Sequence, residues 1–200
     1  SGIWVMDASK LTISGNTFND NREYGIYVLG KYVSHTDPDP MVTTSTNNVT
    51  AGPGTESISY RNLSNGSLAG TISGNIITNA GGHNAISLCV SDHVMVNGNN
   101  QVTGGSNGIV LEVASNCTVQ GNTVSSTGSN GIVLISGSSS NHILGNTVSN
   151  VHSGSTGTPG DCGWGIGIDL GSNNNNNIGD GTLANANTVT LCDAGIIFYG

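Results

Sequence analysis

Charged residues are scarce in this chain, and that scarcity excludes several functions. Only 8% of its 200 residues are Asp, Glu, Lys or Arg, and 4 basic residues stand against 12 acidic ones, which gives a formal net charge of -8. Nucleic-acid binding needs clustered lysines and arginines, so we expect no nucleic-acid partner. No apolar run approaches the length of a membrane span. No stretch shows a 3.6-residue apolar stripe, so helices should be few.

What the chain does contain is a repeat. A Gly-Ile phrase, with Ala in place of Gly once, opens copies at Gly2, Gly25, Ala85, Gly108, Gly131, Gly165 and Gly195. Undisturbed copies start 23 residues apart, as from Gly108 to Gly131. A composition rich in Gly, Asn, Ser and Thr is also typical of disorder. A disordered chain has no reason to place Ile, Val and Leu on a fixed period, so the repeat predicts a solenoid.

Apolar residues alternate within each copy, and alternation predicts strands. Ile109 and Leu111 would point inward while Val110 and Glu112 point outward. Three short strands and Gly/Asn/Ser turns fill a coil of about 23 residues. These repeats resemble the pectin lyase-like superfamily, in particular its generic parallel β-helix repeat proteins. The resemblance implies an all-β, right-handed parallel β-helix of about seven coils, as a single domain over residues 1–200, and the crossover rule favours the same hand.

Three segments interrupt the period. They lie near residues 30–56, 152–164 and 172–185. The first contains Pro38 and Pro40, and proline is excluded from a central strand. We therefore expect loops that leave the coil at these places, where long loops often carry function.

Asparagine recurs at one turn of the repeat, after the glycine of a Gly-Asn pair. Asn tolerates left-handed backbone and bonds nearby backbone groups. Stacked at the strand spacing of ~4.8 Å, these side chains predict a structural amide ladder. Its expected members are Asn16, Asn75, Asn99, Asn122 and Asn146.

Two of the four cysteines share a position in the repeat. Cys162 and Cys192 each precede a Gly-Ile phrase by three residues, which predicts the same site on adjacent coils. The strand spacing suits the Cα separation of a disulfide, so a Cys162–Cys192 bridge is expected. Cys117 should be a buried free thiol, and Cys89 should point outward. No Cys/His spacing matches a zinc motif, so we expect no metal and no cofactor.

The outward residues of the first strand form two predicted columns. One column is Trp4, Tyr27, Ser59, Ser87, Val110, Val133, Gly167 and Ile197, and the other is Met6, Leu29, Arg61, Cys89, Glu112, Ile135, Asp169 and Tyr199. An apolar strip of this kind is typical of a surface covered by a loop or a partner. A sugar-binding platform is the other interpretation, with Trp4, Tyr27 and Tyr199 as the carbohydrate-binding or interface candidates.

Catalytic candidates come from the second column. Arg61, Glu112 and Asp169 share it, and a polysaccharide lyase needs a base such as Arg near acids that hold Ca²⁺. Glu112 and Asp169 lie two coils apart, about 9–10 Å, which an inverting glycosidase tolerates. The loop residues His35, Asp37 and Asp39 are a weaker candidate set. Neither the clustered aspartates of polygalacturonases nor the Asp-Pro-His-Glu of alginate epimerases is present.

The function expected from these features is that of an extracellular or cell-surface module, structural or adhesive. Four cysteines and very few lysines favour that location. No amphipathic helix caps the strands expected near residues 3–5 and 196–198, which predicts either an excised piece or head-to-tail self-association into a fibre. Binding of a surface polysaccharide is the other expected activity. The alternative is a polysaccharide-active enzyme (lyase, glycoside hydrolase or uronate epimerase), and Ca²⁺ belongs to the lyase alternative alone.

Overall fold

A computed structural model of the protein describes residues 2–6, 11–21, 24–29, 42–51, 56–61, 70–79, 82–153, 163–168 and 175–199. Within these ranges the chain forms twenty-two strands and one 3₁₀ turn, η1 (Leu183–Asn185). No helix in this described part is long and apolar enough to cross a membrane.

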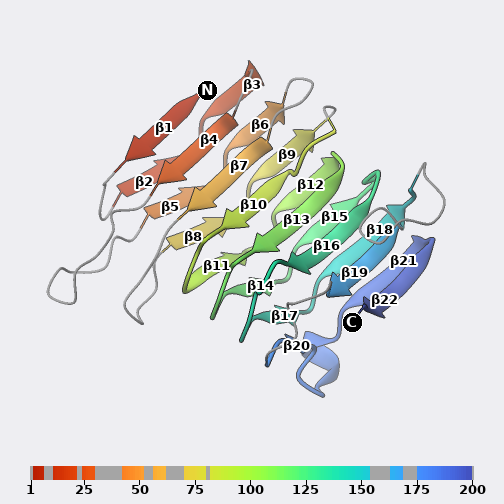
Figure 1. Ribbon diagram of the computed structural model, residues 1–200. Helices are drawn as coiled ribbons and strands as arrows, with labels where there is room; N and C mark the ends of the chain where they lie inside the picture. The colour runs from red at the N-terminus through yellow and green to blue at the C-terminus, as the bar shows by residue number, and fades with distance from the viewer. Residues whose placement is uncertain are drawn as a thin grey trace, which may run out of the picture.

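The strands build three parallel sheets, which run side by side along the molecule (Figure 1). The first sheet contains β1 (Ile3–Met6), β4 (Tyr24–Leu29), β7 (Glu56–Arg61), β10 (Ile86–Cys89), β13 (Asn107–Glu112), β16 (Asn130–Ile135), β19 (Trp164–Ile168) and β22 (Ala194–Phe198). The second contains β2 (Leu11–Ser14), β5 (Val42–Ser45), β8 (Gly70–Ser73), β11 (Val94–Asn97), β14 (Thr118–Gln120), β17 (His142–Leu144) and β20 (Asn177–Ile178). The third contains β3 (Thr17–Asn21), β6 (Asn48–Ala51), β9 (Ile76–Asn79), β12 (Gln101–Gly104), β15 (Thr123–Ser125), β18 (Thr147–Val151) and β21 (Thr188–Cys192).

Consecutive strands belong to successive sheets, so three strands complete one coil. Seven coils and the additional strand β22 follow one another, and the expected parallel β-helix is confirmed. The loop predicted over residues 30–56 is wrong for residues 42–51, which form β5 and β6 of the second coil. The Thr/Ser/Asn composition of that segment suggested a loop, but Val42 and Val49 turn inward at alternate positions and are buried. The segment predicted near 172–185 likewise contains β20 and η1.

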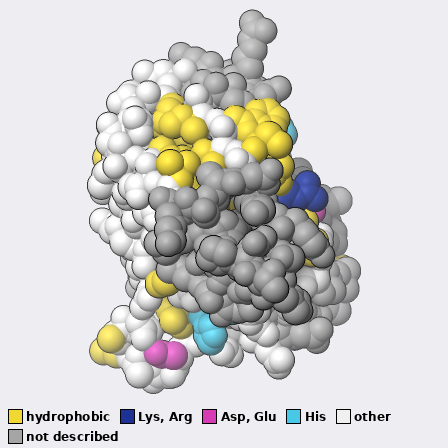
Figure 2. Space-filling model, turned by 90° about the vertical axis from the view of Figure 1, so that its left-hand side faces the viewer, with side chains coloured by type: hydrophobic (Ala, Val, Ile, Leu, Met, Phe, Trp, Pro, Cys, Tyr) yellow, Lys and Arg dark blue, Asp and Glu magenta, His cyan; other side chains and the backbone are white. Residues whose placement is uncertain are grey.

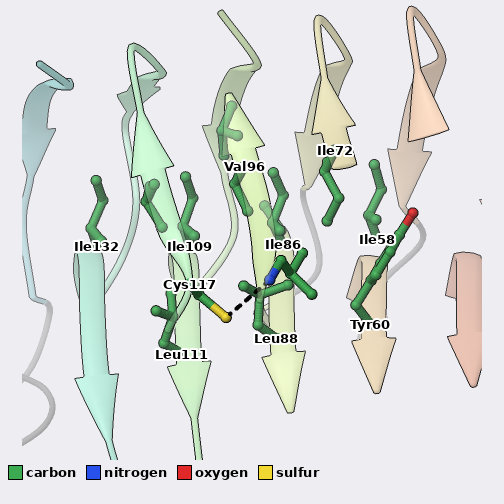
Figure 3. Close-up of a cluster of buried hydrophobic side chains, with 14 of the residues drawn as sticks. Ile58, Tyr60, Ile72, Ile86, Leu88, Val96, Ile109, Leu111, Cys117 and Ile132 are labelled. Atoms are coloured by element: carbon green, nitrogen blue, oxygen red, sulfur yellow. Dashed lines mark hydrogen bonds between the residues drawn. The ribbon is translucent and has the colours of Figure 1, made fainter. Parts of the chain in front are cut away.

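The core lies between the sheets and is built from stacked columns. In the first sheet one inward column is isoleucine in every coil: Ile3, Ile26, Ile58, Ile86, Ile109, Ile132, Ile166 and Ile196. Figure 3 shows four of them side by side on neighbouring strands. β-Branched side chains fit a pleated surface well, so the isoleucine of each inner coil packs against those of the neighbouring coils and is buried by them.

Polar side chains also lie within this core, among them Tyr60, Thr44 and Cys117. Tyr60 is fully buried, its hydroxyl donates to the Val42 carbonyl at 3.1 Å, and burial raises its pKa. Cys117 is a buried free thiol, as expected, and burial raises its pKa to about 12. The Val94 N–H donates to its Sγ at 3.5 Å, the dashed line of Figure 3. A thiol with so high a pKa is inert at neutral pH.

An asparagine ladder runs through the turn before the third sheet. Each Asn Nδ2 donates to the Oδ1 of the Asn on the next coil, at 2.8–3.1 Å. Its members are Asn16, Asn47, Asn75, Asn100, Asn122, Asn146 and Asn187. The prediction of Asn99 is wrong. Gly98 and Asn99 both have positive φ and form a turn one residue longer, so Asn100 is the residue that precedes the third-sheet strand.

The predicted Cys162–Cys192 disulfide is not supported. Cys162 lies outside the described residues, and Cys192 carries a free thiol. In register, Cys192 of β21 lies beside Val151 of β18. The register neighbour of Cys192 is therefore Val151, which stands eleven residues before Cys162 in the sequence.

Candidate functional site

The outer face of the first sheet carries the two columns that the repeat predicts. Pairing places Trp4 beside Tyr27, Tyr27 beside Ser59, and so on to Gly167 and Ile197. The second column runs from Met6 through Leu29 to Arg61, and from Cys89 through Glu112 to Ile135. Asp169 lies outside the described residues, as do His35, Asp37 and Asp39.

A cavity of about 170 Å³ opens on this face over β4, β7, β10 and β13. Its lining residues are Tyr24, Tyr27, Glu56, Ser59, Arg61, Ser87, Cys89 and Glu112. The cavity therefore brings together three predicted candidates, Tyr27, Arg61 and Glu112, and adds Tyr24 and Glu56. The floor is polar, because Ser59 and Ser87 face outward yet are only 4% and 3% exposed.

Aromatic rings line the N-terminal side of the cavity. The Tyr24 and Tyr27 ring centroids lie 4.6 Å apart, and Trp4 meets Tyr27 edge-on at 5.1 Å. Trp4 is 55% exposed. Figure 2 views the molecule from the side of the first coils and shows hydrophobic side chains gathered there. Rings of this kind offer a large apolar surface with a polar edge.

The charged side chains occupy opposite ends of the cavity. Glu56 begins β7, whereas Arg61 ends it and Glu112 ends β13. Cys89 lies between Arg61 and Glu112 on the intervening strand. Burial raises the pKa of the Cys89 thiol, the Glu112 carboxylate raises it further, and Arg61 partly offsets the rise. Both ion pairs among the described residues join a histidine to an aspartate, so the exposed Arg61 guanidinium faces the cavity without one.

A second amide ladder ends at Glu56. Asn130 Nδ2 donates to Asn107 Oδ1 at 2.8 Å, and Asn107 Nδ2 donates to Asn84 Oδ1 at 2.9 Å. Asn84 Nδ2 then donates to Glu56 Oε1 at 3.1 Å. Sequence reasoning missed both the ladder and Glu56. The signal was available, because each of these asparagines directly precedes the Gly or Ala of a Gly-Ile phrase.

The other half of the face is apolar and closed. Val110, Val133 and Trp164 form a separate cluster and are at most 4% exposed. The Trp164 ring lies over Gly167, where any Cβ would overlap it. Tyr199 belongs to this half, 6.2 Å from Trp164. The three aromatic candidates are therefore split, with Trp4 and Tyr27 at the cavity and Tyr199 at the far end of the sheet.

The two glutamates of the cavity do not form a glycosidase pair. By strand register, Glu56 is level with Asn107 of β13, which lies two strands away. Glu112 follows Asn107 by five residues along that strand. Strand geometry then puts their Cα atoms about 19 Å apart, whereas paired catalytic carboxyl groups lie roughly 5–10 Å apart. Among the described residues no group of three His, Cys, Asp or Glu could hold a metal ion.

Comparison with known proteins agrees with this architecture. The family model of the right handed beta helix region matches residues 1–200. The chain belongs to the right-handed β-helix family. This family membership gives the coils of the β-helix protein their right hand, and the three parallel sheets are consistent with it. No curated protein and no solved structure matches the chain. A β-helix supports many activities, so the function of this β-helix protein has to come from the cavity itself.

Proposed function

We propose that this chain is an extracellular or cell-surface β-helix module that binds carbohydrate through the cavity over β4, β7, β10 and β13. The observation that carries the proposal is that one cavity brings two packed tyrosine rings together with two carboxylates and a guanidinium. Sugar rings have apolar C–H faces and polar hydroxyl edges, and the cavity offers surfaces for both. Low charge and scarce lysine support the location outside the cell.

The size and polarity of the cavity suit one sugar unit. Its 170 Å³ fall below the roughly 300–1,000 Å³ of pockets for drug-sized ligands. Carboxylates only accept hydrogen bonds and Arg61 only donates them. A sugar hydroxyl does both, so hydroxyls at different positions of the ligand are suited to Glu56 at one end of the cavity and to Arg61 and Glu112 at the other. The exposed Trp4 extends the aromatic surface beyond the cavity, where a neighbouring sugar unit of the same glycan would lie.

Replacing Tyr27 with alanine should weaken glycan binding about tenfold or more, because a buried aromatic anchor carries much of the binding energy of a site. The measurement is isothermal titration of a panel of neutral, amino and acidic oligosaccharides. Tyr199→Ala is the matched control, since Tyr199 lies on the same face but outside the cavity. The affinity of the Tyr199→Ala variant for the same oligosaccharides should stay within twofold of that of the unsubstituted protein.

Three results would count against the proposal. The panel could show no binding, Tyr27→Ala could bind as well as the unsubstituted chain, or Tyr199→Ala could lose as much affinity. Release of new reducing or unsaturated ends from the panel would favour the enzyme alternative. Arg61 is the residue that the lyase form of this alternative assigns as the base, and it lines the cavity.

Self-association is a second candidate, supported by the apolar surface of the last described coil. A cavity of about 510 Å³ there is lined by Ile178, Leu183, Ala186 and Ile196, among others. Leu183 is 93% exposed and Phe198 69%. In the asparagine ladder each amide donates to the asparagine of the next coil, so Asn187 of the last described coil accepts from Asn146. A coil of a second copy stacked head to tail would continue the ladder and cover these side chains.

Leu183→Asp should move assembly to about tenfold higher protein concentration, because it puts a charge on the proposed contact while disturbing no buried side chain. Light scattering over a concentration series measures the mass. Val113→Asp is the control, since Val113 is 48% exposed in the middle of the solenoid. A monomeric mass for the unsubstituted chain at every concentration would remove this candidate.

A further inference from the structure

We infer that the cavity selects a sugar unit that carries a protonated amino group, that Glu56 and Tyr24 receive this group, and that uronates are rejected. The inference rests on the proposed carbohydrate binding and names its ligand class. Two carboxylates face one guanidinium in the lining, inside a chain of net charge -8.

Charge balance argues against an acidic sugar. A uronate entering the cavity would lose water beside Glu56 and Glu112, and Arg61 is the one cationic side chain among the described lining residues. Like charges brought together in a partly desolvated site repel each other strongly at short range. The negative field of the whole chain also slows the approach of a polyanion. A cationic sugar gains from both effects.

Glu56 is the carboxylate placed to receive the ammonium. Arg61 lies at the opposite end of β7, five residues away or about 16 Å along the strand, while Glu112 ends its strand on the Arg61 side. Arg61 therefore compensates Glu112 more than Glu56. Among the described residues that line the cavity, Glu56 is therefore the carboxylate without a cation close by.

The second amide ladder orients the Glu56 carboxylate before a ligand binds. Asn84 holds Oε1 at 3.1 Å, and Asn107 and Asn130 hold Asn84 in line. Because the carboxylate is half-buried and oriented before binding, little side-chain entropy is lost when a ligand arrives. The hydrogen bond to Oε1 limits the rotation of the carboxylate, and an ammonium offers three N–H donors to the other oxygen, Oε2. Asn84 is a positioning residue in this scheme.

Tyr24 supplies the second half of an ammonium site. It lies directly beside Glu56 in register on the neighbouring strand, at the spacing of adjacent strands. Both residues line the cavity, and Tyr27 packs against Tyr24 at 4.6 Å. A cation near the face of an aromatic ring is stabilised by the ring quadrupole. An acidic group next to a tyrosine is therefore suited to an amine and unsuited to a second acid.

The test compares two ligands that differ at one group, a glucosamine oligomer and its N-acetylated counterpart, by titration calorimetry at mildly acidic pH. We expect the free amine to bind about tenfold tighter, and added salt to reduce the difference. An oligogalacturonate of the same length should bind weakest. Glu56→Gln should abolish the preference for the amine, measured as the ratio of the two affinities, because it removes the negative charge and keeps the oxygen that Asn84 holds.

Two further variants isolate the role of Glu56. Glu112→Gln is the matched control in the same cavity and should keep most of the preference for the amine. Asn84→Ala should reduce the preference without abolishing it, because Glu56 stays but is no longer held. Equal affinity for the two oligomers, or a preference that survives in Glu56→Gln, would overturn the inference while carbohydrate binding stands. Absence of binding to every oligomer would overturn the proposed function instead.

Discussion

Replacing Asn100 with alanine should lower the free energy of unfolding by about 3–5 kcal/mol, because two buried backbone groups lose their partners at roughly 1–3 kcal/mol each. The Asn75 N–H donates to Asn100 Oδ1 at 3.0 Å, and Asn100 Nδ2 donates to the Ile72 carbonyl at 2.9 Å. Asn100 itself is fully buried. Urea denaturation followed by circular dichroism measures the change.

The neighbouring asparagine provides the control. Asn99 is exposed, and its φ of 61° suits glycine, so Asn99→Gly should change the free energy of unfolding by less than about 1 kcal/mol. The two residues are adjacent in sequence and are both asparagine, but only Asn100 belongs to the asparagine ladder. A loss in Asn99→Gly as large as that in Asn100→Ala would show that the ladder is not what stabilises this turn.

These two asparagines also show what the sequence could predict about the fold. The Ile, Val and Leu period predicted the parallel coils and the register of the outer columns, because strand alternation leaves little freedom once the core side is fixed. A turn has no such constraint. One added residue between Asn97 and Gln101 shifts the ladder position from Asn99 to Asn100, and no residue count from the preceding glycine reveals it.

The same reasoning explains which parts of the candidate site were predicted. Arg61 and Glu112 occupy strand positions in phase with the repeat, and the cavity contains both. Asn84, Asn107 and Asn130 stand one residue before the Gly or Ala of a Gly-Ile phrase, and Glu56 occupies the equivalent position before Ser57-Ile58. The alternation of apolar residues begins only after this position, so it did not predict these side chains on the outer face. The Cys162–Cys192 pairing was wrong for a related reason. A spacing measured across an insertion carries no register, and Val151 is the neighbour of Cys192.

Gly131→Ala should be destabilising by about 2–4 kcal/mol, near the upper end of overpacking effects. The glycine of the Gly-Ile phrase is not required by its φ angle. A Cβ on Gly131 would overlap Val148 Cγ1 and would lie 2.5 Å from the Gly165 carbonyl oxygen of the next coil. Val148 is fully buried and the carbonyl is part of the sheet, so neither can withdraw without separating two coils.

Gly128→Ala, three residues earlier, is the matched control for this prediction. Its nearest atom would be the Gly105 oxygen at 3.6 Å, an ordinary contact, so the free energy of unfolding should rise slightly or stay unchanged. Combining Gly131→Ala with Val148→Ala removes one of the two clashes. The double variant should therefore lose less than the sum of the single losses. Strict additivity would mean that Val148 does not set the demand for glycine, and the carbonyl of the next coil would then be its sole cause.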